Sequence, residues 1–253
     1  MYCKSLYTLV TDHSSCSDVK QWKNLPDDYW GDAYGHIDLV DMYFFMDTIR
    51  LIFKSGHLLD DEQQELNDWF RQLLEYLLTT RSGIRGYLAG NNIGTYHDLF
   101  VMAVASFVGD MDTLVTTVPW TTERLWEQVD PTSGALPHEL ARPTCMHYQI
   151  YCLEGWTNVA RVAQGIGYNL WPTKRDGTEP LCQAVEYVLA RGGACPGNIA
   201  EEDPRKLWSL WFEAMPHCPG ITDPTNATIS SPYDVPNDVV SHYWNLGMQD
   251  QKL

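Results

Sequence analysis

Residues 60–80 read DDEQQELNDWFRQLLEYLLTT and carry the clearest structural pattern in the chain. Large apolar side chains recur there at steps of three and four residues, which is the spacing of one face of an α-helix. Acidic residues precede this face, and Asp60 or Asp61 stands where an N-terminal cap is favoured. The pattern predicts a helix over residues 58–80 with an apolar face made of Leu66, Trp69, Phe70, Leu73, Leu74, Leu77 and Leu78.

Helical spacing continues on both sides of this stretch. Residues 34–54 repeat apolar side chains at the same step and end before Gly56, so they are predicted to form a helical hairpin with 58–80. A glycine-bearing loop is predicted over 81–90, followed by a helix that ends near Gly109. Further helices are predicted after Pro119 and over 144–165, 179–190, 204–214 and 234–246. No run alternates with the period of a strand, so the sequence predicts an all-α protein built from helical hairpins.

The composition bounds the classes of function. With 253 residues and 44% hydrophobic content, the chain can form one sizeable domain, which we place over 33–253 after an irregular lead-in over 1–32. No window approaches the roughly 20 consecutive apolar residues of a membrane span. The formal net charge of -16 argues against nucleic-acid binding, which depends on clustered Lys and Arg. An anionic sugar is still compatible with it, because screening over about 10 Å lets a single arginine dominate its surroundings.

The seven cysteines form no CxxC pair, which argues against a zinc ribbon or a thioredoxin-type site. Their odd number leaves at least one thiol free. The first ten residues hold one lysine and a very short apolar stretch, too little for a signal peptide. The segment from His138 to Arg142 begins like the HExxH helix of a zinc protease, but it has an arginine where the second histidine belongs.

Two polar segments concentrate the groups that could carry chemistry. Residues 91–98 read NNIGTYHD, and residues 139–148 read ELARPTCMHY. They supply amides, an arginine, imidazoles and phenols, which can bind a sugar carboxylate and move a proton beside it. Each group also has an ordinary structural role, because asparagines cap helices, arginines form surface salt bridges and phenols are buried on apolar helices.

Six motifs occur in a consistent order between residues 34 and 190. They are Gly35-His36-Ile37-Asp38, Trp69-Phe70, Asn91-Asn92-x-Gly94-Thr95, Gly109-Asp110, Glu139-Leu140-Ala141-Arg142 and His147-Tyr148. In this order they resemble the alginate lyase family of (α/α)-toroid polysaccharide lyases. The closer resemblance is to the glucuronan and alginate lyases of polysaccharide lyase family thirty-eight.

The resemblance implies an (α/α) toroid and a lyase that cleaves a 1,4-linked polyuronide, glucuronan or alginate, by β-elimination without a metal ion or another cofactor. It also implies an anionic polysaccharide as the partner and an extracellular location. Relatives carry additional helices before the Gly35 region, so an incomplete toroid is expected here. A fragment, a truncated gene model and a diverged short form are explanations that the sequence leaves open.

The chemistry explains the residue types at the implied site. β-Elimination removes the proton on C5, beside a carboxylate, which must be neutralised by hydrogen bonds so that negative charge can delocalise into it. Asn92, with Asn91 beside it, is suited to this task because free N–H groups and the dipole of a helix start favour an anion. Tyr148 is the expected proton carrier. A tyrosine pKa is ordinarily about 10, so it needs nearby positive charge, which the family pattern places at Arg142.

Further side chains complete the predicted site. His147 is expected to bind or orient the substrate, because neighbours on a helix point about 100° apart and Tyr148 takes the catalytic position. Glu139 and Tyr96 are predicted, like Asn91, to bind substrate.

The chain departs from the family at one position of the first motif. The family usually has a histidine after its two asparagines, where this chain has Ile93, and His97 is the candidate to replace it as a catalytic residue. Weak activity is therefore expected. Two other hypotheses stay open, which are a non-catalytic carbohydrate-binding protein on the same scaffold and a purely structural helical domain.

Overall fold

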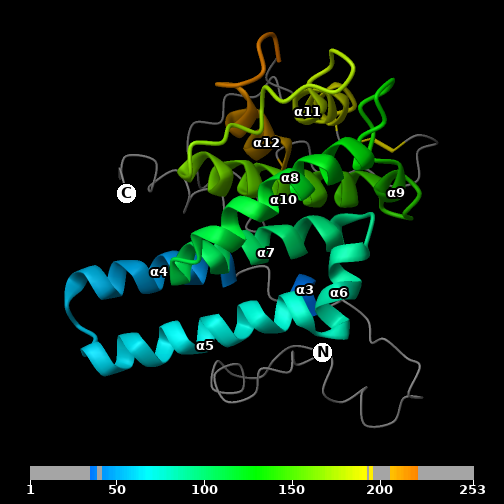
Figure 1. The fold of residues 1–253 in the computed structure, drawn as a ribbon. Coiled ribbons are helices and arrows are strands. Elements are labelled where there is room, and N and C mark those ends of the chain that lie inside the picture. The colour runs from blue at the N-terminus through cyan, green and yellow to red at the C-terminus, as the bar shows by residue number, and fades with distance from the viewer. Residues whose placement is uncertain (1–34, 39–41, 193, 196–205, 222–253) are drawn as a thin grey trace. The chain divides into compact units, whose positions relative to one another are not determined.

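The computed structural model describes residues 35–38, 42–192, 194–195 and 206–221 of the chain. Within these ranges the protein is helical and contains no extended strand, and an isolated β-bridge joins Arg175 and Thr178 (Figure 1). The all-α prediction is confirmed. The expected lead-in over 1–32 and the expected helix over 234–246 lie outside the described residues.

The chain divides into two compact units. The first contains residues 1–89 and 96–117, and the second contains residues 90–95 and 118–253. The helices α7 (Asn92–Val108) and α8 (Met111–Gln128) each contribute residues to both units. None of the helices in the described ranges is long and apolar enough to cross a membrane.

The first unit begins with the helical hairpin that the sequence predicts. Its helices are α3 (Gly35–Asp38), α4 (Met42–Ser55), α5 (Asp60–Thr79) and α6 (Arg81–Leu88). The half-buried Phe107 of α7 packs against both helices of the hairpin, with its ring centroid 4.5 Å from that of Phe70 and 6.0 Å from that of Phe53. Phe70 is buried, and complete burial of such a side chain stabilises a fold by about 1.5–3 kcal/mol. Five of the seven side chains of the predicted α5 face are buried, and Leu66 is half-buried. The prediction was wrong for Leu78, which is 44% exposed near the end of the helix.

Two local predictions in the first unit were wrong. Leu59, and neither aspartate, is the cap residue of α5, and its N–H donates to the Glu62 carboxylate at 2.9 Å. The predicted loop over 81–90 is largely the helix α6, which Thr80 caps by accepting a hydrogen bond from the Gly83 N–H at 3.1 Å. Gly83 serves close packing and not a turn, because a Cβ there would collide with the Leu77 carbonyl.

The helix α8 begins eight residues before Pro119, which the sequence analysis placed at its start. Asp110 caps the true start, since its carboxylate accepts the Thr113 N–H at 3.0 Å and the Thr113 hydroxyl at 2.8 Å. These hydrogen bonds lower the pKa of Asp110. A proline inside a helix costs about 3 kcal/mol. The burial of Leu114 and Leu125, on either side of the proline, offsets this cost.

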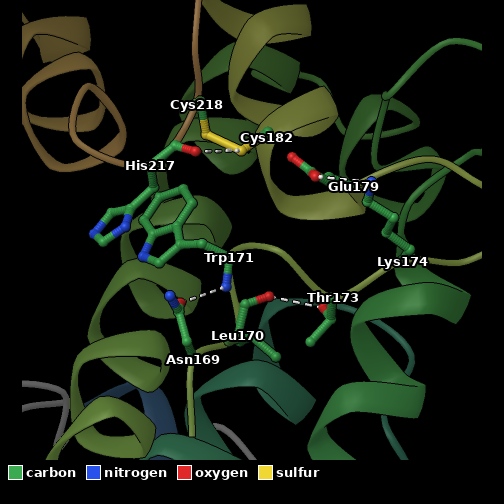
Figure 2. Close-up of a disulfide and its surroundings, with 9 residues drawn as sticks. All are labelled: Asn169, Leu170, Trp171, Thr173, Lys174, Glu179, Cys182, His217 and Cys218. Carbon is green, nitrogen blue, oxygen red and sulfur yellow. Dashed lines mark hydrogen bonds and ion pairs between the residues drawn. A yellow bond between two sulfur atoms is a disulfide. The ribbon is translucent and has the colours of Figure 1, made fainter.

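The second unit is built around α10 (Cys145–Gly165), which contacts α9 (Pro137–Leu140), α11 (Pro180–Ala190) and α12 (Leu207–Ala214). A disulfide between Cys145 and Cys195 fixes the start of α10, and a second one between Cys182 and Cys218 joins α11 to the segment after α12. Figure 2 shows the second disulfide beside the stacked rings of Trp171 and His217, whose centroids are 4.8 Å apart. Among the described cysteines, Cys152 is a free and buried thiol.

Substitution of Gly134, in the turn before α9, tests the packing of the second unit. Its φ is +81°, and a Cβ there would come 2.5 Å from the Gln183 carbonyl oxygen. Gly177 has a similar φ of +85° but open space around it. We expect Gly177→Ala to cost about 1–2 kcal/mol of unfolding free energy for the left-handed backbone alone. Gly134→Ala should cost clearly more, as measured by urea unfolding, and equal losses would contradict the packing described here.

Candidate active site

The first polar segment meets the second through a buried carboxylate. Asn92, the first residue of α7, donates its backbone N–H to Glu139 Oε1 at 2.5 Å. The Asn92 side-chain amide donates to Oε1 at 3.0 Å and to Oε2 at 2.9 Å. Asn92 is 3% exposed and Glu139 is 1% exposed. The carboxylate that occupies the start of α7 is thus one of the protein's own.

The N–H groups in the first turn of α7 are used within the protein. The Ile93 N–H donates to the Asn91 side-chain oxygen at 3.2 Å, and the Gly94 N–H donates to the Asn91 carbonyl at 2.9 Å. With the Asn92 N–H bound to Glu139, the turn does not offer the free donors that the sequence analysis expected there.

Glu139 is held in an environment of opposing electrostatic effects. Burial raises the pKa of its carboxyl, since a low-dielectric surrounding disfavours the charged form. The hydrogen bonds from Asn92 oppose this effect, and so do the charges of Arg142 and His138, but burial dominates the pKa of Glu139. Burial and the nearby Glu139 charge also raise the pKa of the Cys152 thiol well above its ordinary value. The Cys152 thiol is therefore an inert buried group.

Arg142 and Tyr148 form the pair that the sequence analysis expected. The Arg142 Nη2 donates to the Tyr148 hydroxyl oxygen at 2.8 Å, and the guanidinium carbon lies 4.0 Å from the centre of the phenol ring. Both side chains are half-buried. Because the arginine supplies the hydrogen of this bond, the phenol keeps its own proton for another acceptor.

His147 is exposed beside Tyr148. Its ring meets that of Tyr148 edge-on with centroids 5.3 Å apart, and it lies parallel to the ring of Tyr151 at 6.2 Å. An exposed imidazole between two phenols is accessible to a ligand. Its predicted role in substrate binding stays a prediction.

A buried glutamine that the sequence analysis did not select holds the Asn91 turn in place. Gln128 donates from Nε2 to the Asn91 carbonyl at 3.0 Å. Its Oε1 accepts from the Thr95 hydroxyl and the Trp156 indole N–H, each at 2.9 Å, and from the Cys152 thiol at 3.6 Å. A glutamine near the end of an amphipathic helix ordinarily lies at the surface. The signal that could have identified it is its position three residues after the buried Leu125, on the same face of α8.

Tyr96 and His97 belong to the first unit and are both buried. His97 Nε2 lies 3.2 Å from the Leu77 carbonyl, and its Nδ1 lies 3.5 Å from an Asp98 carboxylate oxygen. The His36 ring is 5.3 Å away. These contacts explain His97 as a link between the helices of the first unit. Its predicted catalytic role stays a prediction.

The segment that begins like a zinc-protease helix uses its side chains in other contacts. Glu139 binds Asn92, and Arg142 binds Tyr148. In the described ranges, no group of three or more His, Cys, Asp or Glu side chains is arranged to hold a metal ion.

Comparison with known proteins places the chain in a family. The family profile described as alginate lyase matches residues 14–195, which is well over half of the chain, and the protein belongs to this family. The family recognised from the six motifs is therefore confirmed, whereas the assignment to polysaccharide lyase family thirty-eight stays a prediction.

A solved structure supports the fold. The chain is similar to the crystal structure of an alginate lyase from Bacteroides ovatus, with a TM-score of 0.67 and 22% sequence identity. The match covers 73% of this chain and 50% of that chain, so this protein spans about half the length of that relative. The similarity supports the (α/α)-toroid fold class. A search of curated proteins gave no match.

The raised pKa of Glu139 predicts a pH dependence of stability. A carboxyl whose pKa is higher in the folded chain stabilises the fold below its unfolded pKa, near 4.5, and this contribution is lost as pH rises through the folded pKa. Glu139→Gln should therefore lose less unfolding free energy than the parent between pH 4.5 and neutral pH. Urea unfolding at a series of pH values measures this, with the exposed Glu186→Gln as a control that should follow the parent. The same slope in Glu139→Gln and the parent would contradict this prediction.

Proposed function

We propose that this protein is a polysaccharide lyase, which cleaves a 1,4-linked polyuronide such as glucuronan or alginate by metal-independent β-elimination. Membership of the alginate lyase family supports the reaction class. The observation that carries the proposal is the contact between Arg142 and Tyr148, a cation directly beside a half-buried phenol. The subfamily, polysaccharide lyase family thirty-eight, is part of the same proposal.

The reaction needs one group that removes a proton and one that returns it. Tyr148, as phenolate, takes the proton from C5, the C–H electron pair forms the C4–C5 double bond, and the C4–O bond breaks. The phenol then gives the proton to the leaving oxygen, so that one residue serves both steps. Arg142 lies where the phenolate charge develops and stabilises it through the 2.8 Å contact. Because Tyr148 would act first as the base and then as the acid, the C5 proton and the leaving oxygen must lie on the same face of the sugar.

The substrate carboxylate needs hydrogen-bond donors and positive charge. Arg142 supplies the charge within the second unit, which also contains the Asn91–Asn92 turn and His147. A local cation can act in this way although the whole chain is strongly acidic, because charges beyond about 10 Å are screened at physiological salt. The partner that we propose is therefore an anionic polysaccharide.

We further propose an extracellular location. The two disulfides of the second unit support it, because such bonds form and persist mainly in oxidising compartments. A secreted enzyme would also meet its polymeric substrate outside the cell.

A second candidate function is carbohydrate binding without catalysis. Ile93 favours it, since an isoleucine can neither donate to a carboxylate nor accept a proton. The Ile93 side chain is half-buried beside the Asn91–Asn92 turn. A binding titration with uronate oligomers, in a chain that shows no turnover, would select this alternative.

Replacement of the phenol tests the proton carrier. We expect Tyr148→Phe to reduce the elimination rate by roughly a hundredfold to ten-thousandfold, because general acid–base catalysis typically contributes that much. The matched control is Tyr187→Phe, in which a half-buried phenol also lies under an arginine, with the Arg191 guanidinium carbon 4.5 Å from the ring centre. The control should keep the parent rate. A Tyr148→Phe variant that is folded and nearly as fast as the parent would exclude Tyr148 as the carrier.

Ile93 offers a gain-of-function test. A donor that acts in the transition state is typically worth about 3–4 kcal/mol, or several hundredfold in rate. Ile93→His should therefore raise the initial elimination rate on glucuronan or alginate. His97→Ala, which removes a buried ring, should lower stability, and it should lower the rate per folded molecule only if His97 has taken over the missing role. A vigorous parent rate that neither substitution changes would show that position 93 is irrelevant to the chemistry.

A further inference from the structure

The Asn92 amide is poorly placed to meet a substrate. Its nitrogen faces both oxygens of Glu139, and the residue is 3% exposed. A sugar carboxylate that approached this amide would also approach the Glu139 charge, and two carboxylates at one site repel each other. The contact between Asn92 and Glu139 is therefore internal to the protein.

Asn91 is placed differently. Its side-chain oxygen accepts the Ile93 N–H, and its backbone carbonyl accepts hydrogen bonds from Gln128 and Gly94. These contacts fix the residue on one side. In the described part of the chain, its side-chain nitrogen has no hydrogen-bond partner, and the residue is half-buried. Asn91 therefore keeps a fixed amide donor that a ligand can reach.

We infer that Glu139 is a positioning residue, which binds Asn92 so that the Asn91 amide is the side-chain donor for the substrate carboxylate. This inference rests on the proposed lyase function and deepens it. In place of the contact with sugar that the sequence analysis assigned to it, Glu139 joins the segment that carries Arg142 to the start of α7.

The contact between Glu139 and Asn92 also joins the Asn91–Asn92 turn to the segment that carries Arg142. Glu139 precedes Arg142 by three residues, and the Arg142 charge acts favourably on its carboxylate. His138, on the same helix, also acts favourably on the Glu139 carboxylate, and the Glu139 charge raises the pKa of the buried Cys152 thiol of α10. A fixed Glu139 thereby holds the Asn91 turn in register with the segment that leads to Tyr148.

A paired substitution tests the role of Glu139. Glu139→Gln places a glutamine amide against the amide of Asn92, and Asn92→Asp places a second carboxylate against that of Glu139. Each substitution alone should therefore lower kcat/KM roughly tenfold to a hundredfold. The double variant exchanges the two side-chain types, since the new glutamine can donate to the new aspartate and still accept the backbone N–H at position 92. The net charge of the pair is unchanged. We expect kcat/KM of the double variant to return to within a few-fold of the parent.

The double variant distinguishes a positioning role of the contact between Glu139 and Asn92 from direct binding of the substrate by Asn92. If the Asn92 amide itself bound the sugar, the double variant would present a carboxylate to a carboxylate and its activity would stay as low as that of Asn92→Asp. That result would overturn the inference.

Asn91→Asp tests the proposed donor. The new carboxylate can still accept the Ile93 N–H at the helix start, where an acidic residue is favourable, so the melting temperature should not fall. KM for uronate oligomers should rise at least about tenfold, because a charged hydrogen bond is replaced by repulsion. The control is Asn169→Asp, since the Asn169 side-chain oxygen accepts the Trp171 N–H at 3.1 Å in a similar turn outside the candidate site (Figure 2). An unchanged KM in Asn91→Asp would overturn the assignment of the donor.

Stability measurements separate this inference from the proposed function. A double-mutant cycle over Glu139→Gln and Asn92→Asp, read by urea unfolding, reports their coupling in any chain that folds. Absence of coupling would overturn the inference whatever the activity. A parent chain that neither binds nor cleaves a polyuronide, but shows the coupling, would overturn the proposed function and with it the substrate role of Asn91.

Discussion

The second unit depends on a carboxylate that is removed from water. Glu139 is buried, and its oxygens take three hydrogen-bond contacts from the backbone and side chain of Asn92. A buried carboxylate without such partners would be costly, so its contacts and the burial must form together. The helix start, the α9 segment and Arg142 are held to one another because this condition must be satisfied.

A second buried polar residue, Gln128, also has its hydrogen-bonding groups satisfied within the protein. Gln128 brings the Asn91 carbonyl together with Thr95 at the start of α7 and with Cys152 and Trp156 in the middle of α10. Buried polar networks that are fully satisfied tend to fix one arrangement of their helices. Arg142 and Tyr148, the pair that we propose to be catalytic, belong to the same unit and are half-buried.

Much of the fold could be predicted from the sequence, because apolar side chains at helical spacing determine which face packs. The predicted α5 face and the end of α7 at Gly109 follow directly from such local signals. The helix α6 and the early start of α8 were missed for a shared reason. Gly83 and Pro119 ordinarily break helices, and the tertiary contacts that overrule them are invisible in the sequence.

The candidate site was predictable to a different degree. The contact between Arg142 and Tyr148 was expected from the order of the family motifs. The burial of Glu139 and the role of Gln128 were not, because a charged or amide side chain in a helix ordinarily lies at the surface. Their positions depend on long-range packing, with Asn92 and Glu139 separated by 47 positions.

The most direct test is the product of a reaction with defined polymers. The folded chain would be incubated with glucuronan, polymannuronate and polyguluronate, while ultraviolet absorbance follows the new C4–C5 double bond and mass spectrometry follows the oligomers. The lyase mechanism predicts rising absorbance with at least one polymer, and products one water molecule lighter than the corresponding saturated oligomers. Saturated products, or no cleavage of any of the three polymers, would contradict it.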